Sequence, residues 1–222
     1  MIPNGRSERL ASKGTRAILL NVATNLFFQK GYPNTTIREI GQKANISNSI
    51  IYHYFKNKEE MLFEIIQAAS QDLVNALVDI QRRITDPIEC LKEMLTTHMV
   101  VWCLKRKKEV KIVVADDYFL KGKRREENLN IQRKIYSLYM LKLEELRGMG
   151  YLKPIDLKVL AFTLFGTVNW FFRWYHEGGP LSKDDVARNV IMIIFDGILN
   201  DSIKDYRDNE RTAIGFERGS PC

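Results

Sequence analysis

Residues 35 to 62 read TTIREIGQKANISNSIIYHYFKNKEEML, and this stretch decides the fold of the first part of the chain. A short helix is predicted from Thr36, whose hydroxyl stands at capping-box spacing from Glu39. After a three-residue connection, Ser47 is a favourable N-cap for a second short helix over residues 48–55. Two short helices joined by so tight a turn predict a helix-turn-helix.

The side chains of this stretch divide into a predicted core and a predicted outer surface. The core set is apolar and consists of Ile37, Ile40, Ala44, Ile46, Ile50, Ile51 and Phe55. The outer set is made almost wholly of hydrogen-bond donors, namely Thr35, Arg38, Ser47, Asn48, Ser49, Tyr52, His53, Lys56 and Lys58. Such a surface suits the major groove of DNA.

The start of the second helix is predicted to read bases, because a recognition helix presents its N-terminal side chains to base edges. Asn48 and Ser49 are the candidates for direct readout, and Tyr52 or His53 is expected to reach a thymine methyl group or a phosphate. The alternative is that the aromatic residues of this helix are simply core, which is the favoured reading for Phe55.

Phosphate contacts are predicted at the two ends of the motif. Lys56 and Lys58 supply cations, and the helix amides capped by Thr36 and Asn57 supply N–H donors. The alternative is that both lysines are ordinary solvated charges. Their clustering favours the functional interpretation.

Outward from the motif, apolar residues recur at helical spacing and strand-like alternation is missing, so the predicted fold class is all-α. A helix before the motif is expected to end at Gly31, a typical C-cap residue. About nine helices are expected, over residues 15–30, 36–44, 48–55, 57–83, 88–104, 107–116, 123–147, 156–176 and 183–199. The predicted domains are 1–57 for DNA binding, 58–200 for effector binding and dimerisation, and a loose tail over 201–222.

The net charge of +7 lies wholly in the N-terminal quarter of the chain. Residues 1–58 hold nine Lys and Arg against two acids, whereas the remainder has 25 of each sign. This excess favours a polyanionic partner, with nucleic acid first and an anionic membrane surface second. A membrane or partner-binding adaptor predicts a broad apolar face beside the cations, but residues 48–53 carry small polar side chains, so DNA is favoured.

Other features limit the class of protein. The 222 residues are 45% hydrophobic, enough for a packed core, and we expect a cytoplasmic protein because no apolar run has the length of a signal or membrane segment. Three cysteines without paired spacing suggest neither a disulfide framework nor a metal site. No catalytic or nucleotide-binding fingerprint is present, so no enzymatic activity and no cofactor are predicted.

Over residues 15–62 the chain resembles the tetracycline-repressor (TetR) family. The residues that carry the resemblance are Gly31, Tyr32, Thr35, Thr36, Ile37, Ile40, Ala44, Ile46, Ser47 and the run from Ile51 to Lys58. The resemblance implies a homodimeric repressor on an inverted-repeat operator, with a C-terminal body that takes up a small effector and lowers DNA affinity. It places the DNA contacts on Thr36, Asn48, Ser49, Tyr52, His53, Tyr54 and Lys58.

The body carries a predicted dimer interface. The helix over residues 156–176 is apolar nearly all round, which is unfavourable for a surface helix of a monomer. Together with the apolar run of the last helix, over residues 183–199, it predicts a four-helix contact between two copies.

An effector pocket is predicted from a second, shorter resemblance. Residues 168–186 are similar to the C-terminal region of TetR-type regulators of fatty-acid and sterol catabolism, several of which respond to acyl-coenzyme A thioesters. The expected pocket residues are Met99, Trp102, Tyr136, Tyr139, Phe165 and Trp170, with Asn169 and Arg173 for an anionic or carbonyl group.

Alternatives stand beside each of these assignments. The Met and aromatic residues can be plain core, and Arg173 can pair with Glu144, Glu145 or Asp196. The basic runs at residues 105–108 and 121–125 are either solvated surface or a site for the phosphates of a nucleotide-tailed thioester.

Overall fold

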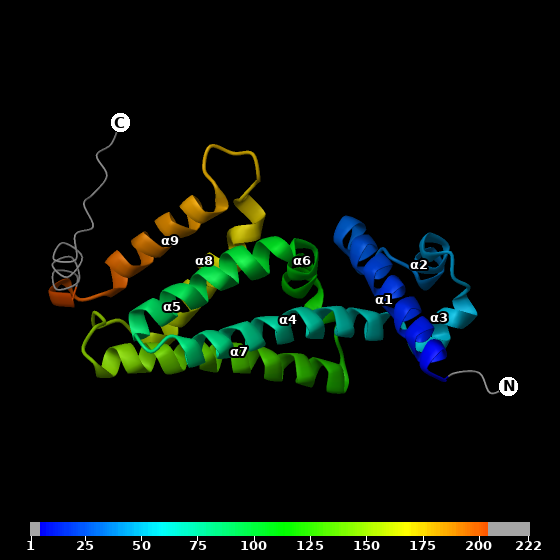
Figure 1. The fold of residues 1–222 in the computed structure, drawn as a ribbon, viewed down its shortest axis with the longest axis horizontal. Helices are drawn as coiled ribbons and strands as arrows, with labels where there is room; N and C mark the ends of the chain where they lie inside the picture. Colours follow the sequence, from blue (N-terminus) through cyan, green and yellow to red (C-terminus); the bar gives the residue numbers. More distant parts are fainter. Residues whose placement is uncertain (1–4, 204–222) are drawn as a thin grey trace. The chain divides into compact units, whose positions relative to one another are not determined.

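A computed structural model of the chain describes the backbone of residues 5–203 and the side chains of residues 14–203. The α-helices are α1 (Gly5–Lys30), α2 (Ile37–Ala44), α3 (Asn48–Tyr54), α4 (Lys58–Arg83), α5 (Pro87–Thr96), α6 (Lys107–Asp116), α7 (Gly122–Gly148), α8 (Leu157–Trp174) and α9 (Lys183–Ile198) (Figure 1). A π-helix, η1 (Thr97–Leu104), follows α5, and a 3-10 turn, η2 (Asp117–Phe119), follows α6. The predicted all-α class is confirmed. Most of the predicted tail lies outside the described residues.

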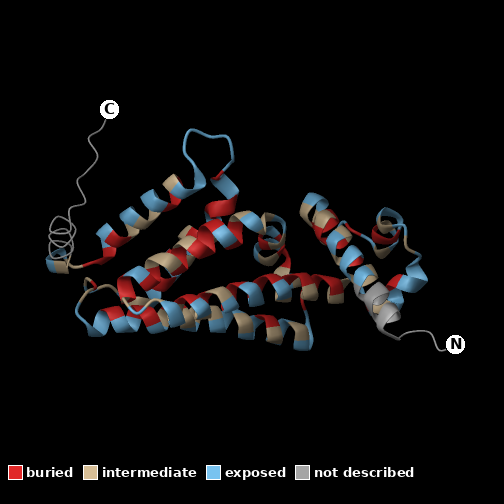
Figure 2. Ribbon diagram, viewed as in Figure 1, coloured by how far each residue is buried: buried red, intermediate tan, exposed pale blue. Residues whose placement is uncertain are grey.

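The helices form two compact units. Among the described residues, the first consists of residues 5–76 and 102–135, and the second of residues 77–101 and 136–203. In each unit the helices turn a buried stripe inward and an exposed stripe outward (Figure 2). These units do not follow the predicted division of the sequence after residue 57, which stays a prediction.

Local capping explains why the helices of the motif begin and end where they do. The Thr36 hydroxyl accepts a hydrogen bond from the Glu39 N–H at 3.2 Å, and the Ser47 hydroxyl accepts one from the Ile50 N–H at 3.4 Å. Asn45 ends α2 in the left-handed conformation, at φ 54°. Gly31, at φ 85°, ends α1 as predicted. Each cap satisfies backbone groups that the helix itself leaves without a partner.

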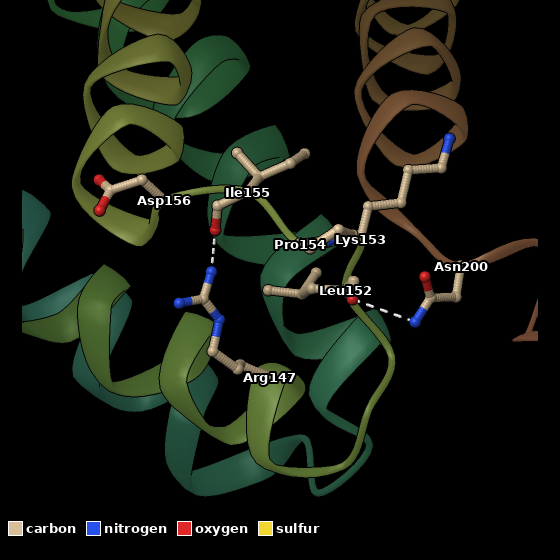
Figure 3. Close-up of a pocket in the computed structure, with 7 residues that line it drawn as sticks. All are labelled: Arg147, Leu152, Lys153, Pro154, Ile155, Asp156 and Asn200. Carbon is tan, nitrogen blue, oxygen red and sulfur yellow. Dashed lines mark hydrogen bonds between the residues drawn. The ribbon is translucent and has the colours of Figure 1, made fainter.

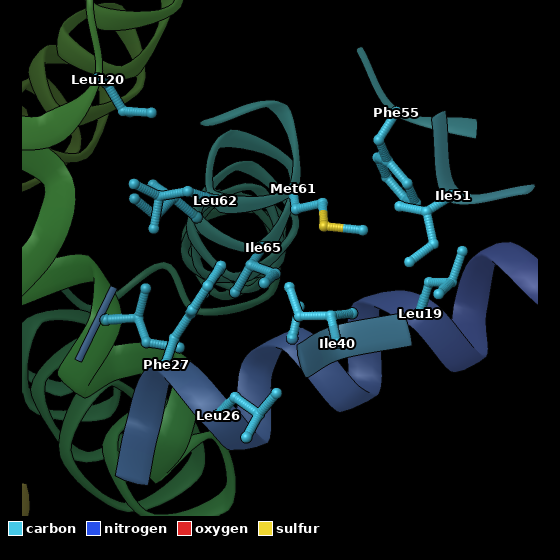
Figure 4. Close-up of a cluster of buried hydrophobic side chains, with 13 residues drawn as sticks. Leu19, Leu26, Phe27, Ile40, Ile51, Phe55, Met61, Leu62, Ile65 and Leu120 are labelled. Carbon is cyan, nitrogen blue, oxygen red and sulfur yellow. The ribbon is translucent and has the colours of Figure 1, made fainter. Parts of the chain in front are cut away.

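The core of the first unit joins the motif to later parts of the chain. Buried side chains of α1, α2, α3 and α4 point toward one another around Ile40 and Phe55 (Figure 4). Ile112 of α6 and Leu120, just after η2, belong to the same cluster. The helix-turn-helix therefore shares its hydrophobic core with the segment that follows η1.

Two side chains of the motif lie on the opposite side from the one predicted. Ile50, expected in the core, is 46% exposed, because α3 turns its neighbour Ile51 inward. Thr35, expected outside, is buried and donates its hydroxyl to the Gly31 carbonyl at 3.0 Å.

The second unit differs from the prediction at one helix. The expected helix over residues 88–104 begins at Pro87, capped by Asp86, but becomes a π-helix at Thr97. The apolar spacing does not distinguish the two forms over so short a segment, because a π-turn is usually a local insertion inside an α-helix. Helices α8 and α9 begin at their N-caps Asp156 and Ser182.

Candidate nucleic-acid interface

Helix α3 presents a polar edge. Its inner side is fixed by Ile51, which is fully buried, while Asn48, Ser49, Tyr52 and His53 are exposed. We call these four residues the reading edge. The Tyr52 side chain is 58% exposed, so the alternative that it is core is wrong for the isolated chain. Phe55, by contrast, is buried, as the core interpretation predicted.

Helix α2 adds Gln42, which the sequence analysis did not assign to the site, and Arg38, which it placed on the outer surface without a named contact. A hollow of about 390 Å³ is lined by Arg38, Gly41, Gln42, Asn45, Ile46, Ser47 and Asn48. Arg38 and Gln42 are exposed and four residues apart, so they share one face of α2 beside Asn48. That spacing was the signal in the sequence which identifies them as partners of the reading edge.

Gly41 allows α2 and α3 to approach closely. A Cβ atom at this position would lie 2.8 Å from the Ile46 carbonyl oxygen and 2.9 Å from Asn48 Oδ1. The Ile46 N–H donates to the Gly41 carbonyl at 2.9 Å, which closes the turn. The missing side chain thus sets the distance between the two helices.

The predicted phosphate contacts differ in their surroundings. Lys56 is exposed, and its backbone N–H donates to Glu60 Oε2 at 2.5 Å. The Asn57 side chain accepts from the Glu60 N–H at 2.9 Å and caps α4, as predicted. Lys58 is half-buried, and its ammonium donates to the carbonyls of Tyr32 and Thr35, each at 2.7 Å.

Tyr54 is placed between surface and core. It is half-buried and packs against the core of the first unit, and its ring meets that of His53 edge to face, with centroids 5.2 Å apart. Its predicted DNA contact therefore depends on the hydroxyl end of the side chain alone.

The basic runs of the body have protein partners within the first unit. Arg106 pairs with Asp72, and Lys108 Nζ donates to Asn25 Oδ1 at 2.5 Å. Arg124 lies 3.8 Å from Glu59 and 3.7 Å from Glu60. These ion pairs and hydrogen bonds favour basic runs that belong to the protein surface and pair within the protein, rather than a site for nucleotide phosphates.

The predicted effector residues do not share one environment. Met99, Trp102 and Tyr139 are buried, Tyr136, Phe165 and Asn169 are half-buried, and Trp170 and Arg173 are exposed. Trp102 belongs to the first unit, where its indole N–H donates to the Ala69 carbonyl at 2.7 Å. Arg173 lies 4.6 Å from the centroid of the Trp170 ring, a cation–π contact at the surface rather than a pocket.

A buried chain of hydrogen bonds runs through the second unit. The Tyr139 hydroxyl donates to the Met94 carbonyl at 3.3 Å, so its oxygen accepts from His98 Nδ1, 3.1 Å away. The Asn169 side chain also hydrogen-bonds to His98 and favours the charged imidazole, but burial has the larger effect. Burial lowers the pKa of His98 to about 3, so the imidazole is neutral at physiological pH. His98 was not among the predicted site residues.

Aromatic rings lead from this chain toward the surface. Tyr139 and Phe165 meet edge to face with centroids 5.0 Å apart, and Phe165 lies 6.3 Å from Tyr136. Tyr136 in turn lies 5.8 Å from Phe162, which is 58% exposed. The four rings form a continuous apolar row between α7 and α8.

A separate hollow of about 500 Å³ lies where α7, the loop before α8 and the end of α9 meet. Its walls are held by hydrogen bonds, from Arg147 to the Ile155 carbonyl and from the Asn200 amide to the Leu152 carbonyl at 3.0 Å (Figure 3). Its polar side chains serve the loop itself, so we assign it no ligand.

Two family models match this chain. Residues 19–65 match the model of bacterial regulatory proteins of the tetR family, and residues 85–198 match the tetracyclin repressor-like C-terminal domain. The chain belongs to the TetR family. As a TetR-family member it is a DNA-binding transcription regulator, and the predicted resemblance is confirmed.

Individual TetR-family relatives agree with this assignment over most of the chain. The transcriptional repressor KstR2 of Rhodococcus jostii is 30% identical over 208 residues, covering 89% of this chain and 98% of the relative. The solved structure of the ketosteroid transcriptional regulator KstR2 of Mycobacterium tuberculosis has a TM-score of 0.76 at 25% identity, covering 84% of this chain and 95% of that one. AibR, solved with isovaleryl coenzyme A and operator DNA, has the same fold, with a TM-score of 0.75 at 23% identity over 82% of this chain and 98% of its own.

Within the part of this TetR-family chain that the structure describes, every helix is too short or too polar to cross a membrane. The names of the family and of its relatives are those of transcription regulators.

Proposed function

We propose that this TetR-family chain is a homodimeric, cytoplasmic repressor that a small lipid-like effector releases from an inverted-repeat operator. The observation that carries the proposal is the reading edge of α3, whose small polar side chains are exposed between two capped helix N-termini. Hydrogen-bond donors and acceptors of this size fit the edges of base pairs in the major groove.

The proposed contacts divide into two classes. Asn48 and Ser49 read base edges, and Tyr52 and His53 reach a thymine methyl group or the backbone. Thr36, Tyr54 and Lys56 contact phosphates, which position the motif without reading sequence. Arg38 and Gln42 join them from α2, because both line the same hollow as Asn48. The exposed Ile50 extends the apolar part of this surface.

Dimerisation through α8 and α9 is supported by large apolar side chains left exposed in the isolated chain. They are Val159, Phe162, Trp170 and Trp174 of α8 and Met192 and Ile193 of α9, each between 49% and 68% exposed. Apolar area of this extent is unfavourable in water and favours burial against a second copy.

The effector class is supported by the second unit. The row of rings is an apolar surface that a ligand could pack against, and His98, Tyr139 and Asn169 provide neutral hydrogen-bonding groups at its inner end. A neutral imidazole suits a ketone or thioester carbonyl better than a carboxylate. The related KstR2 is described as a ketosteroid regulator, and AibR was solved with an acyl-coenzyme A thioester, so we propose a ligand of this kind.

The experiment has two steps. An operator is first selected from random DNA with the purified protein, and footprinting is expected to show two half-sites related by a dyad. Vesicles of anionic lipid serve as the control for the alternative of a membrane adaptor. Equal binding to vesicles and to selected DNA would contradict the proposal.

The second step is release of that operator by chemical probes. Isovaleryl coenzyme A, palmitoyl coenzyme A and a ketosteroid are titrated into the complex, with free coenzyme A and palmitate as matched controls. A thioester or steroid is expected to lower operator affinity, typically by about 5- to 150-fold for such coupling. Release by the controls alone, or by none of the probes, would refute the proposed effector class while leaving the regulator itself intact.

A further inference from the structure

The loop between α1 and α2, residues 31–35, is held from inside by one lysine. Lys58 Nζ donates to the carbonyls of Tyr32 and Thr35, each at 2.7 Å, and lies 3.4 Å from that of Pro33. The same ammonium lies 4.2 Å from the centroid of the Tyr32 ring. An ammonium group has three donors, so these carbonyls account for its whole hydrogen-bonding capacity.

A buried carboxylate holds the same loop from the other side. Asp116, at the end of α6, is only 8% exposed and accepts a hydrogen bond from the Tyr32 backbone N–H. Burial raises the pKa of this carboxyl and lowers the pKa of the Lys58 ammonium, and the charge of each opposes the shift of the other. The peptide groups of Tyr32 therefore lie between a buried carboxylate and a half-buried ammonium group of opposite charge.

The surroundings of this pair come from the segment after η1. The Phe119 ring lies 5.0 Å from that of Tyr32, and Leu120 is fully buried in the core that the motif shares. The Lys121 N–H donates to Glu59 Oε1 at 3.0 Å, next to Lys58 in α4. The loop, the start of α4 and the end of α6 thus form one packed junction within the first unit.

We propose that Lys58 and Asp116 are positioning residues for operator recognition, which fix the loop over residues 31–35 and through it α2, and that Lys58 does not act as a phosphate contact. This goes beyond the proposed function and rests only on its DNA-binding part. Helix α2 begins directly after the loop at its N-cap Thr36, and its face holds Arg38 and Gln42 beside Asn48. Displacing the loop displaces that polar face.

A phosphate contact by Lys58 would require the loss of hydrogen bonds within the protein, whereas a phosphate contact by Lys56 would not. Turning the Lys58 ammonium toward DNA would break both of its 2.7 Å bonds and leave the Tyr32 and Thr35 carbonyls without this donor. Lys56 is exposed and already free to turn toward solvent. The two lysines, two residues apart, therefore make a matched pair for a test.

The test compares Lys58→Met, Asp116→Leu and Lys56→Met in the full chain. Affinity for the selected operator and for unrelated DNA is measured at several salt concentrations. Lys58→Met is expected to lower operator affinity about tenfold or more, with a salt slope equal to that of the wild type and little change on unrelated DNA. Lys56→Met is expected to weaken both DNAs alike and to reduce the magnitude of the slope by about 0.9, the value for one lost phosphate contact.

The double variant Lys58→Met/Asp116→Leu tests whether the two residues act together on the loop or affect operator affinity independently. Because both residues hold Tyr32, the double variant is expected to lose less than the product of the single losses, whereas Lys58→Met/Lys56→Met is expected to lose the full product. A reduced slope with equal loss on both DNAs for Lys58→Met would overturn the proposal, and so would an unchanged operator affinity.

Hydrogen exchange gives a readout that needs no DNA. Faster exchange of the backbone amides of residues 31–35 is expected in Lys58→Met and in Asp116→Leu, but not in Lys56→Met. Unchanged exchange in both would also overturn the proposal. If Lys58→Met does not fold, Lys58→Gln, which keeps one amide donor group, replaces it in every measurement. A wild-type protein that bound no operator would count against the proposed function instead, and the exchange result would still decide the positioning.

Discussion

Helices α3 and α8 each leave one face exposed, and the two faces differ in kind. The face of α3 carries Asn48, Ser49 and His53, small groups that form directed hydrogen bonds, with Tyr52 among them. The face of α8 carries Phe162, Trp170 and Trp174, large groups that gain from leaving water. Exposure alone therefore does not define a partner. A polar edge fits a partner with a pattern of donors and acceptors, whereas an apolar edge fits another apolar surface.

The largest effect is expected from a substitution on the exposed apolar face of α8 and α9. Ile193→Glu on α9, at a side chain 68% exposed, places a charge where a second copy is proposed to dock. We expect a monomeric mass by light scattering at micromolar concentration and an operator affinity about 100-fold lower or worse, because half-sites are then bound singly. Leu141→Glu on α7, at a side chain 58% exposed, is the matched control and should stay dimeric. A dimeric Ile193→Glu protein would rule out this interface.

The polar edge is tested by Asn48→Ala. Removing the amide should relax base preference by about 1–3 kcal/mol at one base pair if Asn48 makes a bidentate contact. Affinities for a set of single-base operator variants measure the effect, and the unaffected base pairs serve as internal controls. Selectivity that is unchanged at every base pair would contradict the assigned role.

The inner sides of the two helices also differ, and the difference predicts that stability depends on pH at the inner side of α8. The inner side of α3 is apolar at Ile51, whereas α8 brings Asn169 to the buried His98. Burial lowers the folded-state pKa of His98 to about 3 from the ordinary histidine value of 6.5, so the unfolded chain binds the proton more tightly. The contribution of His98 to the stability of the fold is therefore fully present above pH 6.5 and is lost as pH falls from 6.5 toward 3.

The expected loss from this histidine between pH 7.5 and pH 5 is about 2 kcal/mol of unfolding free energy. Denaturant unfolding followed by circular dichroism measures it, and His98→Gln provides the reference, since glutamine does not titrate. An equal pH dependence in both proteins would show that His98 accepts its proton within the fold.

The smallest effect is expected at Lys56, and it tests whether the DNA interface extends beyond the reading edge to this residue. Lys56→Gln removes one exposed cation, so operator affinity should fall only a few-fold at moderate salt, with a salt slope smaller by about 0.9. Lys43→Gln, at another exposed lysine of the motif, shows whether every surface cation behaves in this way. Identical slopes for Lys56→Gln and the wild type would remove Lys56 from the interface.

The sequence was sufficient where neighbouring residues determine the structure. Thr36 and Ser47 were predicted as caps and are caps, because a capping hydroxyl bonds to an amide only three residues away. Ile50 was predicted wrongly because adjacent isoleucines on a seven-residue helix cannot both face the core, and spacing does not say which does. The exposure of the reading edge follows from the same local spacing, and its contacts with DNA stay a prediction.

Where distant residues determine the environment, the sequence was insufficient. The carbonyls around Lys58 come from residues more than 20 positions earlier, and Asp116 lies in another helix, so no spacing rule links them. The same holds for His98, whose partners lie in α7 and α8. Trp170 and Arg173 fit the pattern of a pocket, but the direction in which α8 packs leaves both at the surface.

Gly41 has a consequence for how this regulator can change over time. Even alanine at this position would press on the Ile46 carbonyl and on Asn48, so a substitution there alters the geometry of every base contact at once. Ser49, Tyr52 and Arg38 are exposed and can be exchanged one at a time. A relative that evolves to bind a new operator can therefore change these exposed side chains one at a time, whereas position 41 must remain glycine.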